Sequence, residues 1–171
     1  MFCAHKSSSA DISFYASMLR NPEWVRDSGY SLTDFSTNKQ IESFLSPQNE
    51  GDIKLILKIQ ESEEKVAFCH FKQKSNEWIE VNGGVIKKYQ NSLICVCLYV
   101  FTFDKIFHLR PQSKICCAIY EKNIRSLKLN KAMGFRISGQ MFYDTRMFYK
   151  LCLQKEQFYE SPITQRLLKL I

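Results

Sequence analysis

The alternation of apolar and polar residues is clearest in the middle of the chain. Residues 53–59 and 66–71 alternate with a period of two, which is typical of β-strands. The charged segment 61–64 between them predicts a hairpin turn, and the polar segment 72–76 predicts a second turn before a strand that begins at Trp78. We therefore expect three strands in an antiparallel meander.

Helical patterns dominate the segment before this meander. Asp11 is expected to cap a helix from Ile12 to about Leu19. Pro22 is favoured at the start of a short helical turn, and Thr37 is expected to begin another helix that ends at Ser46-Pro47. The first residues, Phe2 to His5, are compatible with a brief edge strand.

The stretch from Trp78 to Phe135 organises the chain. The strand that starts at Trp78 is expected to be interrupted at Asn82-Gly83-Gly84, where two glycines indicate a bulge or a close backbone approach that splays it from its neighbour. The turn Tyr89-Gln90-Asn91-Ser92 leads into an apolar run, 92–107, which predicts a helix covered on most sides. Such a turn at a helix N-terminus can bind an anion.

The residues after this helix are expected to form a strand, a second helix and a hairpin. Residues 114–120 read as a strand, and Asn123 is expected to cap a helix that Gly134 ends. Residues 136–142 and 146–153 predict a closing hairpin. We expect a domain of residues 1–154 and a separate amphipathic tail of residues 155–171, docked on the domain or on a second subunit.

Composition narrows the classes of function. The net charge of +7 suits an anionic ligand or simply solubility, and because the basic residues are scattered we expect no nucleic-acid partner. The apolar run Leu93 to Phe103 is too short to span a bilayer. Seven cysteines show no CxxC pair or zinc spacing, so we expect no metal site and reduced thiols buried as small apolar residues. A soluble cytoplasmic protein is the interpretation that follows.

One segment resembles a known family. Residues 123–136, NIRSLKLNKAMGFR, resemble the motif N-x-x-[SA]-x-x-[LV]-x-x-x-x-GF of the GCN5-related N-acetyltransferases (GNATs). Met18 to Glu23 resembles the W-R-N start of the branch that acetylates ribosomal proteins and aminosugars. The spacing from Arg20-Asn21 to Gln40–Leu45 is similar to that in the nucleotide-sugar N-acetyltransferases of pseudaminic acid biosynthesis. The resemblance covers about residues 11–153.

This resemblance implies an α+β (α/β) GNAT fold. Its central sheet would be mixed but mostly antiparallel, with six to seven strands splayed between the fourth and fifth and about four flanking helices. Acetyl-CoA would lie in the gap between the strand at 80–87 and the strand at 114–120, with its pyrophosphate at the backbone of residues 90–94. The amine of an acceptor would attack the thioester directly in a ternary complex, without a metal.

The resemblance also implies roles for particular residues. Glu80 would be the catalytic base, although a strand residue that faces solvent or pairs with a lysine is an equally ordinary interpretation. Trp24 could instead pack in the core, His70 could be structural, and Asn123 could be a helix cap alone. The expected acceptor-binding residues are Arg20, Asn21, Trp24 and His70. The expected cofactor-binding residues are Val85, Ile86, Lys87, Gln90, Asn91, Ser92, Leu93, Ile94, Asn123, Ser126 and Lys131.

Two positions depart from the family pattern. The pyrophosphate loop [QR]-x-x-G-x-[GA] corresponds to Gln90–Cys95, in which Leu93 and Cys95 replace small residues. The tyrosine that usually protonates the leaving thiolate corresponds to Asn130, so Tyr89, Tyr120, Tyr143 or a water would have to substitute. The apolar run 92–107 is interpreted as core, with no role in binding a cofactor.

Three functions remain open at this point. The first is an acetyl-CoA-dependent N-acetyltransferase of a small-molecule amine, for which a nucleotide-linked aminosugar is one acceptor. The second is a protein N-terminal or ribosomal-protein acetyltransferase. The third is a binding domain that keeps the fold without catalysis. The chain is expected to be a monomer or a homodimer.

Overall fold

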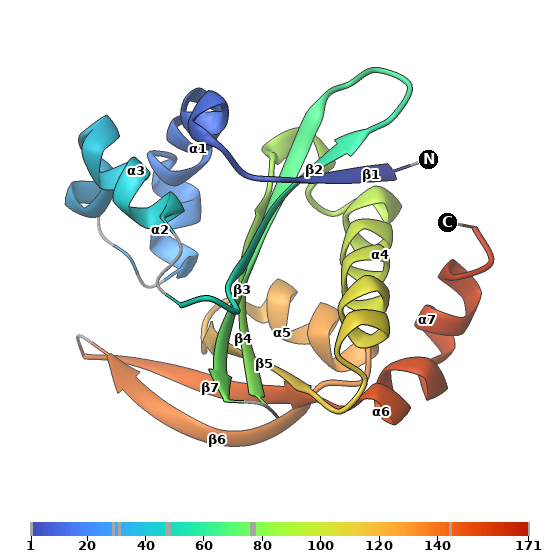
Figure 1. Ribbon diagram of the computed structural model, residues 1–171. Coiled ribbons are helices and arrows are strands. Elements are labelled where there is room, and N and C mark those ends of the chain that lie inside the picture. The colour runs from blue at the N-terminus through green and yellow to red at the C-terminus, as the bar shows by residue number, and fades with distance from the viewer. Residues whose placement is uncertain are drawn as a thin grey trace.

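A computed structural model describes residues 2–28, 30, 32–46, 49–75, 78–143 and 145–170. Its centre is a seven-stranded sheet in the order β1-β2-β3-β4-β5-β7-β6 (Figure 1). The predicted helix end at Ser46-Pro47, the predicted turn at 72–76 and the turn of the predicted closing hairpin fall partly outside these residues. The strands are β1 (Phe2–Lys6), β2 (Ile53–Ile59), β3 (Lys65–Ser75), β4 (Trp78–Val85), β5 (Lys114–Tyr120), β6 (Arg136–Tyr143) and β7 (Arg146–Leu153).

The sheet is mixed, and one short parallel ladder interrupts its antiparallel pairing. β2, β3 and β4 form the predicted meander, and β6 and β7 form the predicted hairpin. Among the described strands, only β4 and β5 run parallel, and their ladder ends at the pair Glu80 and Cys116. Both strands continue beyond this pair, so they diverge. The predicted α+β sheet with a splay between its fourth and fifth strands is confirmed.

The glycine pair in β4 does not act as predicted. The ladder with β3 runs without a shift through Cys69↔Gly83 and Phe68↔Gly84, so β4 is one continuous strand without a bulge there. The alternative interpretation, a close approach, fits both positions. A Cβ on Gly83 would lie 2.9 Å from the carbonyl oxygen of Phe68, and one on Gly84 would lie 2.7 Å from the indole nitrogen of Trp24. These glycines therefore admit neighbours and do not open the splay.

Two layers of helices cover the sheet (Figure 1). On one face, α1 and α3 bury Tyr15, Leu19 and Ile41 against Ile56 and Phe68 of the sheet. On the other, the almost wholly apolar α4 packs with α5 and the C-terminal helices in the main core. The helices of the described residues are α1 (Ile12–Leu19), α2 (Pro22–Ser28), α3 (Asn38–Leu45), α4 (Leu93–Leu109), α5 (Ile124–Ala132), α6 (Lys155–Glu160) and α7 (Pro162–Leu167).

The ends of these helices follow the predicted capping residues with one exception. The side chains of Thr37, Ser92 and Asn123 accept hydrogen bonds from the first turns of α3, α4 and α5. Gly134 ends the α5 segment with a φ of +100°, which favours glycine. Asp11 is the exception, because its carboxylate makes no capping bond to α1 and instead lies buried beside Lys65 Nζ at 2.8 Å.

The C-terminal tail consists of two short helices where one was predicted. Phe158 of α6 is fully buried and Leu167 of α7 almost so, both in the main core. Ser161 between them donates a hydrogen bond to the carbonyl of Ala132 at 2.7 Å. The apolar side chains expected to dock the tail are therefore covered by the chain's own domain, which removes them as a reason for a dimer.

The prediction that all cysteines are reduced thiols is wrong for one pair. Cys116 of β5 and Cys152 of β7 face each other in the antiparallel ladder and form a disulfide. Two sequence-distant strands bring them together, so their spacing along the chain gave no signal. Cys69 and Cys97 are buried thiols as predicted, and Cys3, Cys95 and Cys117 are partly exposed. No helix among the described residues is long and apolar enough to cross a membrane.

Candidate active site

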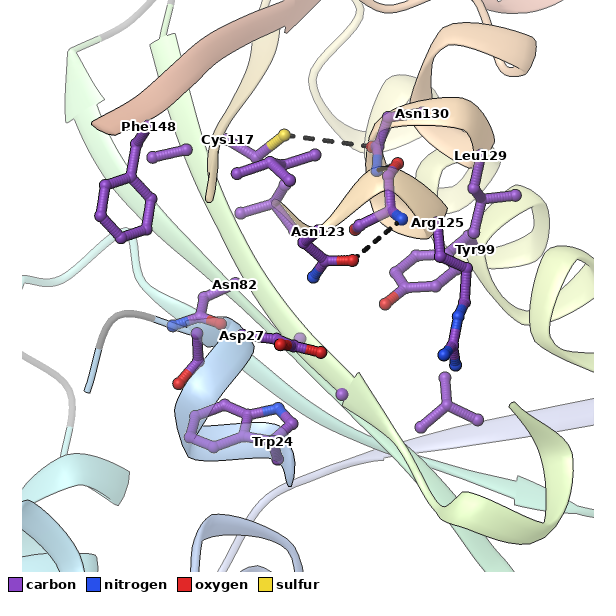
Figure 2. Close-up of a pocket in the computed structure, with 18 of the residues that line it drawn as sticks. Trp24, Asp27, Asn82, Tyr99, Cys117, Asn123, Arg125, Leu129, Asn130 and Phe148 are labelled. Carbon is purple, nitrogen blue, oxygen red and sulfur yellow. Dashed lines mark hydrogen bonds between the residues drawn. The ribbon is translucent and has the colours of Figure 1, made fainter. Parts of the chain in front are cut away.

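A cavity of about 510 Å³ opens where β4 and β5 diverge. Residues 80–85 of β4 and 117–119 of β5 line its two sides, α2 lies at one end, and the starts of α4 and α5 lie at the other. We call these the α2 end and the helix-start end. Figure 2 shows Trp24 and Asp27 at the α2 end and Asn123, Arg125 and Asn130 across the cavity from them.

The inner edge of β4 offers backbone groups to this cavity. Ile86 N–H donates to the carbonyl of Val66 in β3, so the alternation of the ladder turns the odd-numbered residues of β4 towards β5. The carbonyl of Val85 accordingly accepts a bond from the side chain of Gln90 at 3.0 Å. The parallel ladder ends with the pair Glu80 and Cys116, which still uses the N–H of Val81, so the C=O of Val81 and the N–H and C=O of Gly83 face the gap. An extended ligand can bind there as an additional strand would.

The helix-start end is built from the N-termini of α4 and α5. Ser92 accepts a bond from Cys95 N–H at 3.3 Å, while the N–H groups of Leu93 and Ile94 have no partner within the helix, as in the first turn of any α-helix. Arg125 donates to Gln90 Oε1 at 3.5 Å and adds a positive charge. Asn91, with a φ of +63°, shapes the turn. Free N–H groups, two helix dipoles and a guanidinium together favour a phosphate.

Asn123 combines both interpretations made from the sequence. Its Oδ1 caps α5 by accepting from Ser126 N–H at 3.1 Å, and the residue lines the cavity. Figure 2 shows this bond, with the amide nitrogen of Asn123 turned away from the helix. A donor is therefore left for a ligand in the gap between β4 and β5.

Glu80 lies at the point of divergence, because it is the last residue of β4 that pairs with β5. Its carboxylate lines the cavity, is 42% exposed and contacts Lys74 Nζ at 3.0 Å. Burial raises the pKa of the Cys117 thiol to about 12, and the charge of Glu80 adds to this effect. Burial also raises the pKa of Tyr30, again with a contribution from Glu80. The carboxylate thus lies near both side chains and is accessible from the cavity.

The apolar helix α4 contributes to the cavity, contrary to the interpretation that it is core alone. Cys95, Tyr99 and Phe103 follow one another at four-residue spacing and all line the cavity. The four-residue spacing was visible in the sequence, but a continuous apolar run hides which face is open. Burial, with smaller effects from Cys95 and other thiols, raises the pKa of Tyr99 well above its usual value. Its hydroxyl therefore stays protonated and can act as a hydrogen-bond donor.

Asn130 occupies the position where the family has a tyrosine, and its side chain is held in place. Its Nδ2 donates to the carbonyl of Ser126 at 2.9 Å, and Cys117 Sγ lies 4.0 Å from its Oδ1. Of the three tyrosines suggested as substitutes, only Tyr143 lines the cavity. Tyr89 donates to Glu64 at 2.7 Å, and Tyr120 packs against Phe148.

The structure brings together about half of the residues predicted for the site. Those that line the cavity are Glu80, Trp24, Val85, Gln90, Asn91, Asn123 and Ser126. Those that do not line it are Arg20, Asn21, His70, Ile86, Lys87, Ser92, Leu93, Ile94 and Lys131.

Among the residues outside the cavity, those expected on the acceptor side have other structural roles. Arg20 donates to the carbonyl of Phe35 at 2.7 Å, and Asn21 accepts from Glu23 N–H at the start of α2. His70 is 1% exposed, contacts Tyr15 OH at 2.8 Å and packs beside Phe44, and burial lowers its pKa to about 3. The structure therefore gives no support to a substrate-binding role for His70.

Several residues of the cavity were missed at the sequence level. Glu23, Asp27 and Tyr30 come from α2 and the segment after it, whose distance from β4 cannot be read from the sequence, and the others come from α4, β5 and α5. A pair of aromatic residues near acidic ones, as at Trp24 and Tyr30, is the only local signal. The missed residues are Glu23, Asp27, Tyr30, Tyr99, Cys117 and Arg125. In the described part of the chain, no group of three or more His, Cys, Asp or Glu side chains could hold a metal ion.

No family model matches this sequence, and no curated protein is similar to it in sequence. Solved structures are similar in fold. Spermidine N-acetyltransferase from Vibrio cholerae, in complex with CoA and spermine, superposes with a TM-score of 0.81 over 93% of this chain and 98% of that one, at 10% identity. The chain has the GNAT fold. The fold prediction made from residues 123–136 is thereby confirmed.

Other structures with the GNAT fold are similar over nearly their whole length. AAC(6')-Ib in complex with ribostamycin and coenzyme A gives a TM-score of 0.74 at 11% identity, over 94% of this chain and 97% of that one. Ribosomal-protein-S5-alanine acetyltransferase from Vibrio fischeri gives 0.73 at 13% identity, over 92% and 94%.

Proposed function

We propose that this protein is an N-acetyltransferase that uses acetyl-CoA to acetylate the primary amine of a small molecule. One observation carries the proposal: the cavity lies in the gap between β4 and β5, with two helix N-termini at one end and a carboxylate at the point of divergence. The proteins of similar structure are acetyltransferases of spermidine, of aminoglycosides and of a ribosomal protein, which supports the same general reaction.

The residues present fit coenzyme A. The C=O of Val81 and the N–H and C=O of Gly83, which face the gap, can bind an amide-containing arm, as a neighbouring strand would. The first N–H groups of α4 and the guanidinium of Arg125 can hold a pyrophosphate. Leu93, which replaces a small residue of the family pattern, is 61% exposed and does not line the cavity, so its side chain leaves room. Cys95 does line the cavity and restricts it.

Acetyl-CoA would supply the acetyl group as an activated thioester. Glu80 would take the proton from the attacking ammonium, directly or through water, because its carboxylate is exposed to the cavity at the point of divergence. A backbone N–H of β4 facing the gap, such as that of Gly83, would stabilise the negative charge on the thioester oxygen. Tyr99 replaces the family's tyrosine in our proposal, since its hydroxyl stays protonated and lies in the cavity.

A second candidate is a domain that binds CoA without transferring the acetyl group. Asn130 favours it, because an amide cannot protonate a thiolate and this one is held by the carbonyl of Ser126. A thiol-release assay with a panel of small amines separates the two. Acetyl-dependent thiol release that requires an amine supports the enzyme, whereas acetyl-CoA binding without release for any amine supports the binding domain.

We further propose a cytoplasmic location. Five cysteines are free thiols, and two of them, Cys69 and Cys97, are buried where they cannot pair without rearrangement. The Cys116–Cys152 disulfide argues against this location, because a reducing compartment disfavours disulfides. Mass measurement of the protein from cells, alkylated at lysis, would show seven modified cysteines in a reducing compartment and five if the disulfide persists.

A further inference from the structure

The α2 end of the cavity is acidic although the protein as a whole is basic. Glu23, Asp27 and Glu80 line it with only one guanidinium, that of Arg26, among them. The whole chain has 24 basic and 17 acidic residues. The helix-start end has the opposite character, with Arg125 and two helix N-termini. The lining of the cavity thus combines Arg125 and two helix N-termini with three carboxylates, each of which pairs with a cationic side chain.

The three carboxylates are available to a ligand. Glu23, Asp27 and Glu80 are 53%, 35% and 42% exposed. Their ion pairs are with Lys87, Arg26 and Lys74, whose side chains are 72%, 67% and 43% exposed. Pairs between such exposed side chains contribute little, typically below about 1 kcal/mol, so an ammonium group of a ligand can displace the lysine or arginine.

An aromatic wall stands beside these carboxylates. Trp24 and Tyr30 stack with their rings 12° from parallel and their centroids 5.6 Å apart, and both line the cavity. Gly84 lets the indole approach β4, and Asn82 Nδ2 donates to the hydroxyl of Tyr30 at 3.2 Å. The rings are therefore fixed in place. The faces of Trp and Tyr attract ammonium groups, and a neighbouring carboxylate strengthens that attraction.

We infer that the acceptor is a small, flexible molecule with at least two ammonium groups, bound at the α2 end of the cavity. This inference rests on the proposed function. Glu80, at the point of divergence, faces the amine that reacts, while Glu23, Asp27 and the Trp24–Tyr30 wall bind a second ammonium that does not react. A nucleotide-linked aminosugar would bring its pyrophosphate against three carboxylates and is disfavoured by like-charge repulsion.

The test uses the full chain, with spermidine as the polyamine probe and a UDP-linked aminosugar as the anionic probe. Glu23→Gln/Asp27→Asn removes two charges while keeping shape, and Glu42→Gln on the exposed surface of α3, outside the cavity, is the matched control. We expect spermidine to be acetylated, its KM to rise about tenfold or more in the double variant, and no change in the control. The affinity for acetyl-CoA should be the same in all three proteins.

Three results would overturn the inference. One is an equal or greater kcat/KM for the UDP-linked aminosugar, which leaves the proposed function intact. Another is an unchanged KM for spermidine in the double variant. The third is calorimetric titration of spermidine into the chain without acetyl-CoA that gives no binding. If the proposed function itself is wrong, acetyl-CoA will bind to none of the three proteins: the unsubstituted chain, the double variant and the control.

Discussion

The two ends of the cavity are made from different parts of the chain and by different means. At the helix-start end, the lining residues Gln90, Asn91 and Cys95 bring the backbone N–H groups of the first turn of α4 next to the cavity, and side chains such as Asn123 and Arg125 add donors. The α2 end presents side chains: Trp24, Asp27 and Tyr30, with Glu80 at the boundary. Backbone groups recur whenever a fold recurs, whereas side chains are free to change. The first end is thus suited to a constant co-substrate and the second to a particular acceptor.

The comparison leads to an order of expected effects. Substitutions near the point of divergence and at the α2 end should change catalysis most. Substitutions of side chains at the helix-start end should change the affinity for acetyl-CoA only moderately, because backbone groups remain. Four predictions follow this order from the largest effect to the smallest.

Glu80→Gln should lower kcat/KM by about 100-fold or more, because it removes the base that accepts the ammonium proton. The variant keeps the shape of the side chain, so acetyl-CoA affinity and the free energy of unfolding should not change. Lys74→Gln removes only the partner of Glu80 and serves as the control. Steady-state thiol release measures kcat/KM for both variants. If Glu80→Gln turns over at the rate of the unsubstituted chain, another group accepts the proton.

Tyr99→Phe should lower kcat by about tenfold while leaving acetyl-CoA affinity within about twofold, since it removes one donor to the leaving thiolate. Tyr143→Phe is the control, because Tyr143 lines the cavity but is 60% exposed. Burial keeps Tyr99 protonated, so the rate should not fall with alkaline pH through ionisation of this residue. Equal effects of the two variants would argue against a specific role for Tyr99.

Arg125→Ala should weaken acetyl-CoA binding about five- to tenfold, because a charge-assisted hydrogen bond to phosphate is lost at an exposed position. The affinity for pantetheine, which lacks the pyrophosphate, the 3'-phosphate and the adenosine of coenzyme A, should hardly change. Lys128→Ala, on the same helix but outside the cavity, is the control. Calorimetry provides the dissociation constants. A loss that is the same for pantetheine would show that Arg125 acts through the fold and not through phosphate.

Cys95→Ala should tighten acetyl-CoA binding by about two- to threefold, because a smaller side chain lets the ligand approach the first turn of α4 more closely. Leu93→Ala should have no effect, since Leu93 lies outside the cavity and is 61% exposed. The two positions are the departures from the family's loop. If Leu93→Ala tightens acetyl-CoA binding and Cys95→Ala does not, then Leu93 faces the ligand and Cys95 does not, the opposite of our assignment.

Sequence reasoning succeeded where local rules decide the outcome. The helix starts at Thr37 and Asn123 and the stop at Gly134 each depend on neighbours within a few residues. The motif at 123–136 predicted the fold through the same local geometry. The helix-start end of the candidate site follows from these elements, so most of it could be predicted.

Predictions from the sequence failed where segments that are distant in the chain contact each other. Asp11 was expected to cap α1 but pairs with Lys65 from β3, and Cys116 pairs with Cys152 across two strands. The acceptor end depends on how α2 lies against β4, which is set by the contact of Trp24 with Gly84. No local rule predicts that contact. His70 shows the same limit, because its strand alternation did not reveal that α1 and α3 bury it.

The central claim is that the gap between β4 and β5 binds acetyl-CoA. Calorimetric titration of acetyl-CoA into the full chain tests it most directly. We predict one site per chain with a dissociation constant on the order of 10 μM, within the usual range for enzyme substrates. It should weaken in Arg125→Ala, which removes a guanidinium beside the phosphate end of the cavity, with folding checked by thermal unfolding. No binding at millimolar acetyl-CoA by a folded chain would contradict the account.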